Sequence, residues 1–159
     1  MPIEPLIVPF GYRLKEQYRR DLLLHFKMNV NNGLVLPDLS GNGNHGTLTN
    51  MANPPTAISG WGGQGLMFDG VNDGVSVVNI LSNVYTVSFW AKPTTTTEKL
   101  VQLSDTDSVY LTSGVVKSYG FGTPIIYIDG KLTSTFPDTN WHLVTVISSV
   151  PITANSIGF

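Results

Sequence analysis

The segment YTVSFWA, residues 85–91, alternates between apolar and polar side chains, and this alternation decides the fold class. Its apolar parity includes Val87 and Phe89, whereas Ser88 and Trp90 lie on the more polar parity. Successive side chains of a β-strand point to opposite faces of a sheet. The pattern therefore predicts a strand that covers a hydrophobic core with one face, and we expect Val87 and Phe89 in that core.

Short segments of the same kind lie on both sides of residues 85–91, separated by turns rich in Gly, Asn and Asp. Asp129-Gly130 is the best hairpin turn, because this dipeptide favours positive φ angles. Val144 and Val146 continue the predicted buried face. We expect further strands at 22–28, 65–68, 75–78, 99–103, 108–112, 116–121, 125–128, 131–134, 141–147 and 154–159. With no helix expected after Arg20, the sequence predicts an all-β fold, an antiparallel β-sandwich of the jelly-roll type.

The composition excludes several classes of protein. Only 13% of the residues are charged, against about 25% in an average domain. The net charge of −2 provides no field to hold nucleic acid, so we expect no nucleic-acid partner. No apolar run reaches the roughly 20 residues of a membrane helix, so we expect no membrane insertion. The absence of cysteine excludes disulfides, thiolate nucleophiles and cysteine-ligated metals.

Five motifs together resemble the laminin G-like, concanavalin A-like lectin/glucanase domains. They are DLSGNGNHGTLTN (38–50), GLMFDGVNDGVSV (65–77), YTVSFWAKP (85–93), IYIDGKL (126–132) and NWHLVTV (140–146). The resemblance covers residues 21–159, which we expect to form one domain. It implies a jelly roll of two curved antiparallel sheets and a role as a carbohydrate-binding or adhesive module. It also implies, for some members, a structural calcium ion.

The chain departs from that family at both ends. Domains of this kind usually finish with a strand read as G-x-I-D-D-V-R-I-Y, whereas this chain stops at SIGF. We therefore expect the segment 22–28 to have an open edge. Residues 1–10, MPIEPLIVPF, contain three prolines and an acid and do not resemble a signal peptide. We expect synthesis in a cytoplasm without export by the usual route.

Residues 1–20 are predicted to form an extended, proline-rich and basic arm, separate from the sandwich at 21–159. One interpretation is an anchor to neighbouring subunits, in which apolar residues pack on the partner and arginines meet its acidic surface. The residues of this interpretation are Ile3, Leu6, Ile7, Val8, Arg13, Arg19 and Arg20. The alternative is an arm that lies on its own domain.

Glycoside hydrolysis is the first enzymatic activity to test, because glucanases share the fold that the resemblance implies. The reaction needs two carboxyl groups about 5–5.5 Å or about 6.5–9.5 Å apart. The Glu-x-Asp-x-x-Glu motif of such glucanases does not occur in this chain. Asp105 and Asp107 lie in a polar, turn-like segment, which does not provide the apolar surroundings of a general acid. We expect no catalytic residues, no enzymatic activity and no required cofactor.

Two groups of hard oxygen ligands could hold a structural calcium ion. Asp38, Asn42 and Asn44 lie on a glycine-rich loop, and Asp69 and Asp73 flank a turn. The alternative is that these side chains cap turns by accepting hydrogen bonds from their own backbone. Both interpretations stay open.

Sugar binding needs exposed aromatic faces. Trp61 in the loop SGWGGQG and Trp90 on the polar parity are the first candidates, with Tyr110 and Tyr119 as further ones. The alternative is that these rings pack in the core. Trp61 is the residue we most expect to be exposed, because the glycines around it cannot cover it.

These observations predict a non-enzymatic, lectin-like structural or adhesion module. The absence of a signal peptide favours a phage virion component, such as a fibre, decoration or tail-associated protein. Such a protein is made in the host cytoplasm, assembles with other virion subunits or as a homo-oligomer, and meets surface glycans later. The alternative is a carbohydrate-binding domain of a bacterial surface or extracellular protein. The step from fold to either role is analogy.

Overall fold

The computed structural model describes residues 21–29, 33–51 and 57–158. In these ranges every regular element is a strand and every strand pairing is antiparallel. The predicted all-β, antiparallel β-sandwich is confirmed, and the jelly-roll order of its strands stays a prediction. The arm at 1–20 lies outside the described residues. The strands are β1 (Val35–Leu36), β2 (Gly46–Thr49), β3 (Ala57–Gly60), β4 (Gly63–Leu66), β5 (Gly74–Ala91), β6 (Lys99–Gln102), β7 (Ser108–Thr112), β8 (Val115–Tyr119), β9 (Ile125–Ile128), β10 (Lys131–Leu132) and β11 (His142–Gly158).

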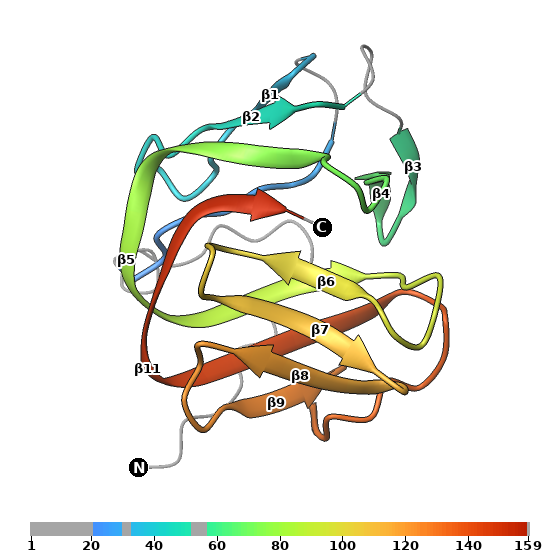
Figure 1. Ribbon diagram of the computed structural model, residues 1–159. Coiled ribbons are helices and arrows are strands. Elements are labelled where there is room, and N and C mark those ends of the chain that lie inside the picture. Colours follow the sequence, from blue (N-terminus) through green and yellow to red (C-terminus); the bar gives the residue numbers. More distant parts are fainter. Residues whose placement is uncertain (1–20, 30–32, 52–56, 159) are drawn as a thin grey trace.

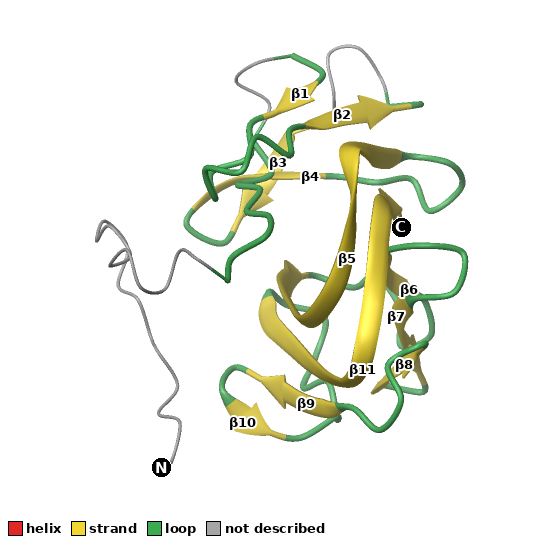
Figure 2. Ribbon diagram, turned by 90° about the vertical axis from the view of Figure 1, so that its left-hand side faces the viewer, coloured by secondary structure: helices red, strands yellow, loops and turns green. Residues whose placement is uncertain are grey.

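A long curved ribbon of β5 and β11 runs through the whole molecule (Figure 1). β5 has 18 residues and β11 has 17, and they pair from His142–Ala91 to Gly158–Gly74. At one end the ribbon pairs with β9, and at the other end β5 pairs with β2 while Gly158 pairs with β6. β6, β7 and β8 form an antiparallel meander whose strands lie against the ribbon (Figure 2).

The ribbon bends where its register is interrupted. Between Ile147 and Ile152 the pairing shifts, so β11 contains extra residues there, which is a β-bulge. Asn83 on β5 has a φ of 57°, in the left-handed region that asparagine tolerates. Ser148 replaces lost ladder bonds with hydrogen bonds from its hydroxyl to the carbonyl oxygens of Phe121 and Val150, at 3.0 Å and 2.6 Å. The bend allows one pair of strands to serve both layers.

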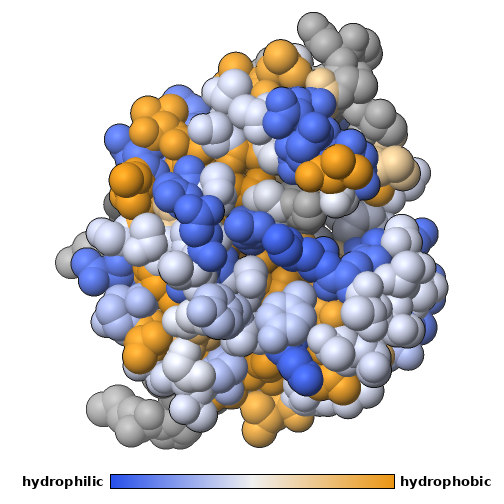
Figure 3. Space-filling model, viewed as in Figure 1, coloured by the Kyte–Doolittle hydropathy of each residue, from blue (hydrophilic) through white to orange (hydrophobic). Residues whose placement is uncertain are grey.

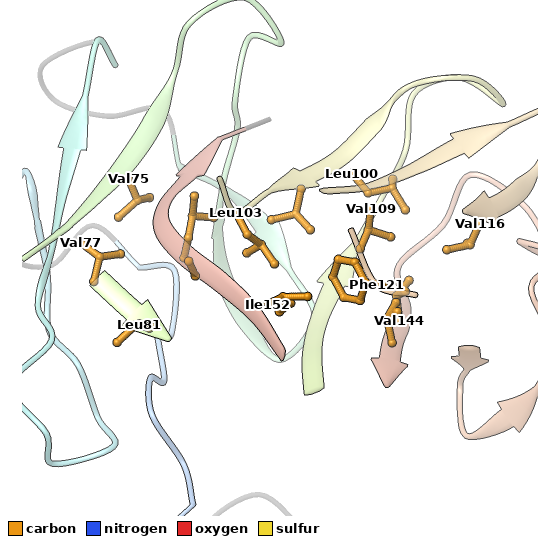
Figure 4. Close-up of a cluster of buried hydrophobic side chains, with 14 of the residues drawn as sticks. Val75, Val77, Leu81, Leu100, Leu103, Val109, Val116, Phe121, Val144 and Ile152 are labelled. Atoms are coloured by element: carbon orange, nitrogen blue, oxygen red, sulfur yellow. The ribbon is translucent and has the colours of Figure 1, made fainter. Parts of the chain in front are cut away.

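The core lies between the ribbon and the β6–β8 meander. Val144 and Val146 are fully buried, as the alternation predicts, and they belong to one cluster with Val109 and Phe121. Figure 4 shows Val109 of β7, Val144 of β11 and Phe121 of the β8–β9 loop directed toward one another. Buried side chains alternate with more exposed ones along β7 and in much of β11, which is the pattern of strands that cover a core with one face.

Several local predictions need correction. Val87 and Phe89 lie on the core face, where they pair with Val146 and Val144, but they are only half-buried and pack against the core cluster from its margin. Residues 22–28 form no strand and belong to no ladder, and their hydrogen bonds go mainly to the loop at 38–44. The two strands expected at 141–147 and 154–159 form one continuous strand, β11.

The surface is mixed in polarity. Figure 3 shows a band of hydrophilic side chains across the middle of the face seen in Figure 1, with hydrophobic groups on either side. Among the described residues, no helix is long and apolar enough to cross a membrane.

Candidate functional site

The hairpin of β3 and β4 carries Trp61 at its tip. Gly60 pairs with Gly63, so the turn consists of Trp61 and Gly62 alone, and Gly62 has a φ of 73°. Gly60 must also be glycine, because a Cβ there would lie 2.9 Å from the amide nitrogen of Gly65. The tight turn keeps the indole out of the core, and Trp61 is 63% exposed. The predicted exposure of Trp61 is confirmed.

Trp61 stacks on Trp90 of β5. The ring centroids lie 4.7 Å apart and the ring planes differ by 15°. Trp90 is 39% exposed, in agreement with its place on the polar parity. Stacking covers one face of each indole and leaves the rest of both rings accessible. The structure thus joins two of the four predicted sugar-binding aromatics into one stacked pair.

Trp141 holds the hairpin in place, and the sequence reasoning missed it. Its Nε1 donates a hydrogen bond to the carbonyl oxygen of Ser59 on β3, at 3.2 Å. Its ring also lies against the hairpin, since a Cβ on Gly65 would be 3.5 Å from the Trp141 Cη2 atom. The alternation of side chains in the sequence could have identified Trp141, because it occupies an odd position and so points away from the buried face that carries Val144 and Val146.

All three tryptophans line a wide groove of about 2320 Å³ that extends well beyond the stacked pair, since residues 21–28 and 98–103 also line it. Val87 and Phe89 pair with Val146 and Val144 and so lie on the opposite sheet face from Trp90, whereas Gln64 and Lys92 contribute polar groups close in sequence to the stacked pair. A flat indole face binds the apolar face of a ring, and amide or ammonium groups bind its hydroxyls. Such a surface can hold a neutral, ring-shaped ligand without any metal or cofactor.

The two predicted tyrosines lie elsewhere. Tyr110 on β7 and Tyr119 on β8 belong to adjacent strands and the same sheet face, because Tyr110 pairs with Lys117. Tyr110 lines a separate cleft of about 690 Å³, and Tyr119 is exposed. Neither lines the groove of the tryptophans, so the four candidates do not form a single site.

The first group of predicted calcium ligands forms a hydrogen-bonded loop. The buried carboxylate of Asp38 accepts bonds from the backbone N–H groups of His25, Ser40 and Asn44, at 3.0, 2.8 and 3.0 Å, and from the Ser40 hydroxyl at 2.7 Å. Burial alone raises the pKa of Asp38, but these donors outweigh it and the pKa lies below its ordinary value. Asn42 donates to the carbonyl oxygens of residues 22 and 23, so this loop fastens the extended segment to the sandwich.

Asn44 and the second group have similar partners. The Asn44 amide donates to the carbonyl oxygen of Leu23 and accepts from Asn79, at 2.9 and 2.8 Å. Asp69 accepts the N–H groups of Val71 and Asn72, which lower the pKa of Asp69, and Asp73 accepts the N–H of Asp69 at 3.0 Å.

Turn capping accounts for these carboxylates. Within residues 21–29, 33–51 and 57–158, no three acidic or histidine side chains form a group that could hold a metal ion. Calcium binding stays a prediction.

His142 lies between two aspartates next to Trp141. Its Nδ1 is 2.6 Å from Asp129 Oδ2 and its Nε2 is 3.0 Å from Asp138 Oδ1. Burial lowers the pKa of His142, but the two carboxylates outweigh burial and raise the pKa above its ordinary value. When it is protonated, His142 therefore makes an ion pair with each aspartate.

Asp105 and Asp107 lie in the turn between β6 and β7. Asp107 is buried and accepts a hydrogen bond from the Ser104 hydroxyl at 2.7 Å, which is the arrangement of a turn cap. Asp105 is exposed. The absence of catalytic residues stays a prediction.

Comparison of the chain with models of protein families, with curated proteins and with solved structures finds no match. The laminin G-like resemblance rests on the sequence motifs alone.

Proposed function

We propose that the protein is a non-enzymatic, lectin-like module of the laminin G-like kind that binds surface glycans through the Trp61–Trp90 pair. The observation that carries this proposal is the exposed indole stack at the margin of a groove. Exposed large aromatic rings leave apolar surface in water, and ligand binding removes that surface from water. The hydrogen bond from Trp141 to Ser59 holds the β3–β4 hairpin in place before any ligand binds, and this reduces the conformational entropy lost on binding.

A glycan array followed by calorimetric titration tests this proposal. The wild-type protein is expected to bind a reproducible set of glycans, and Trp61→Ala and Trp90→Ala are each expected to weaken binding about tenfold or more, or about 1.4 kcal/mol. Tyr119→Ala is the matched control, because Tyr119 is also 63% exposed but lies away from the groove. Unchanged glycan affinity in both tryptophan variants would refute the site. A loss of affinity in Tyr119→Ala alone would place the binding site on β8 instead.

A structural role in a virion, with contacts to other subunits or to copies of itself, is the second candidate function. Val78 and Ile80 on β5 favour it, since they are 70% and 69% exposed and two residues apart. Apolar side chains of this kind are typical of contacts between chains. We expect concentration-dependent association by light scattering that the double variant Val78→Ser/Ile80→Ser reduces. A monomer at all concentrations would count against self-association through β5.

A further inference from the structure

The side chains of Asp129, His142 and Asp138 connect three segments of the chain. Asp129 belongs to the β9–β10 turn, His142 begins β11, and Asp138 lies in the loop between β10 and β11. The distances of 2.6 Å and 3.0 Å place one carboxylate oxygen on each ring nitrogen. Both ring nitrogens donate only in the imidazolium form. The geometry therefore fits protonated His142, and a neutral ring loses one of its two hydrogen bonds.

The cluster fixes the loop that leads into Trp141. Asp129 Oδ1 accepts the N–H of Leu143 at 2.9 Å, and Asp138 Oδ1 accepts the N–H of Asn140 at 2.6 Å. Phe136 in the same loop is buried and meets the His142 ring edge to face, with the centroids 5.0 Å apart. Trp141 is thus flanked on both sides by residues that the cluster holds.

The cluster and the tryptophan pair are linked through one side chain. Trp141 precedes His142 in the chain and bonds to Ser59 of β3, and the β3–β4 hairpin carries Trp61 onto Trp90. A change in the path of residues 138–142 moves the Trp141 indole, and the hairpin depends on that indole for its hydrogen bond. The coupling path is short and consists of direct contacts.

We propose that protonated His142, clasped by Asp129 and Asp138, locks Trp141 and the β3–β4 hairpin in the ligand-binding arrangement, so that glycan affinity falls when His142 loses its proton. This regulatory role rests on the proposed function for its effect on glycans, whereas the effect on the hairpin does not depend on it. Trp141 is then a positioning residue of the site.

The charged groups near His142 determine the direction of the effect. Asp129 and Asp138 are the two charged groups that face His142. The charge of Lys131 lowers the pKa of Asp129, and Ala91, the strand partner of His142, is uncharged. Burial raises the pKa of Asp129, but the hydrogen bonds from His142 and Leu143 and the charges of His142 and Lys131 together outweigh it, and the pKa values of both aspartates lie below their ordinary values. Both carboxylates therefore stay ionised over the range in which His142 titrates, above about pH 6.5.

The first measurement follows the hairpin without any glycan. Near-ultraviolet circular dichroism of the stacked tryptophans and hydrogen exchange of residues 57–66 are recorded from about pH 5.5 to about pH 9, a range that covers histidine titration. The wild-type protein is expected to show a transition above the ordinary histidine pKa, with faster exchange at high pH after correction for the intrinsic pH dependence. His142→Gln and Asp138→Asn are expected to abolish or shift this transition.

His25→Gln is the matched control, because the His25 side chain is exposed and its contact with Asp38 is made by its backbone. This variant should keep the wild-type transition. The same transition in His142→Gln and Asp138→Asn, or no transition in the wild type, would overturn the proposal. Asp138→Asn keeps the test decisive where His142→Gln fails to fold, since Asp138 is exposed.

The second measurement is glycan affinity over the same pH range. We expect a fall of about fivefold or more on raising the pH through the transition in the wild type and in His25→Gln. A flat profile in both, with binding intact, would contradict the regulatory role. Absence of glycan binding at every pH would refute the proposed function instead. The dichroism and exchange data would still decide whether protonation of His142 controls the β3–β4 hairpin.

Discussion

The hairpins β3–β4 and β9–β10 have turns of equal length but different backbone geometry, because Asp129 has a positive φ, of 51°, whereas Trp61 does not. Each has a two-residue turn, Trp61-Gly62 in one and Asp129-Gly130 in the other, with glycine at positive φ in the second position. β9 pairs with β11 and belongs to the main sheet, whereas β3 and β4 form a separate two-stranded sheet. The first hairpin exposes an indole, and the second directs a carboxylate onto His142. The two hairpins therefore also differ in their attachment to the core, which is weaker for the hairpin whose tip we propose binds a ligand.

The largest expected difference between the hairpins is in their stems. Ile128 of β9 is 1% exposed and belongs to the core cluster, whereas Ile58 of β3 is half-buried. Ile128→Ala should lower the free energy of unfolding by about 2–5 kcal/mol, because it leaves a cavity. Ile58→Ala should cost clearly less. Urea denaturation measures both, and equal losses would mean that the β3–β4 hairpin is as much a part of the core.

The turn glycines should differ by a smaller amount. Gly130→Ala forces an L-residue to a φ of 75° and should lower the global stability by about 1 kcal/mol. Gly62→Ala meets the same strain at 73°, but the hairpin can open alone, so its loss should appear as faster hydrogen exchange of residues 57–66. A change in the urea midpoint as large as that of Gly130→Ala would contradict this distinction.

The pH dependence of stability should distinguish the β9–β10 hairpin, whose turn residue Asp129 contacts His142, from the β3–β4 hairpin, whose turn has no charged residue. The folded-state pKa of His142 is raised, so its contribution is fully present below the unfolded value of about 6.5 and is lost as the pH rises through the folded value. The melting temperature of the wild type should therefore fall over this range relative to His142→Gln. Because the aspartates are largely exposed, the effect should be modest and should shrink in high salt.

The smallest expected effect on stability is at the proposed binding tip. Trp61→Ala removes an exposed ring whose stacking on Trp90 contributes about 0.5–1.5 kcal/mol to the hairpin, but because the hairpin can open alone, the global free energy of unfolding should change by less than about 0.5 kcal/mol. Differential scanning calorimetry on Trp61→Ala and Tyr119→Ala gives the comparison. A loss as large as that of Ile128→Ala would assign Trp61 a structural role.

The sequence alone determined the features that depend on near neighbours. The strand class followed from alternation at residues 85–91 and 141–147, and the Asp129-Gly130 turn followed from the dipeptide, since both rules act over a few residues. The exposure of Trp61 followed in the same way from its glycine neighbours. These predictions needed no knowledge of how distant segments meet.

Only the tertiary structure decided which segments meet. The stacking of Trp61 on Trp90 and the bond from Trp141 to Ser59, 82 residues away in the chain, depend on where the hairpin lies on the ribbon. The half-buried state of Phe89, on the opposite sheet face from Trp90, depends on how the layers pack around the core. Asp38 likewise became a hydrogen-bonded anchor because residues 22–25 cross its loop. Alternation and turn residues specify each strand and its faces, but the pairing of remote strands and the contacts between layers result from packing the whole chain at once.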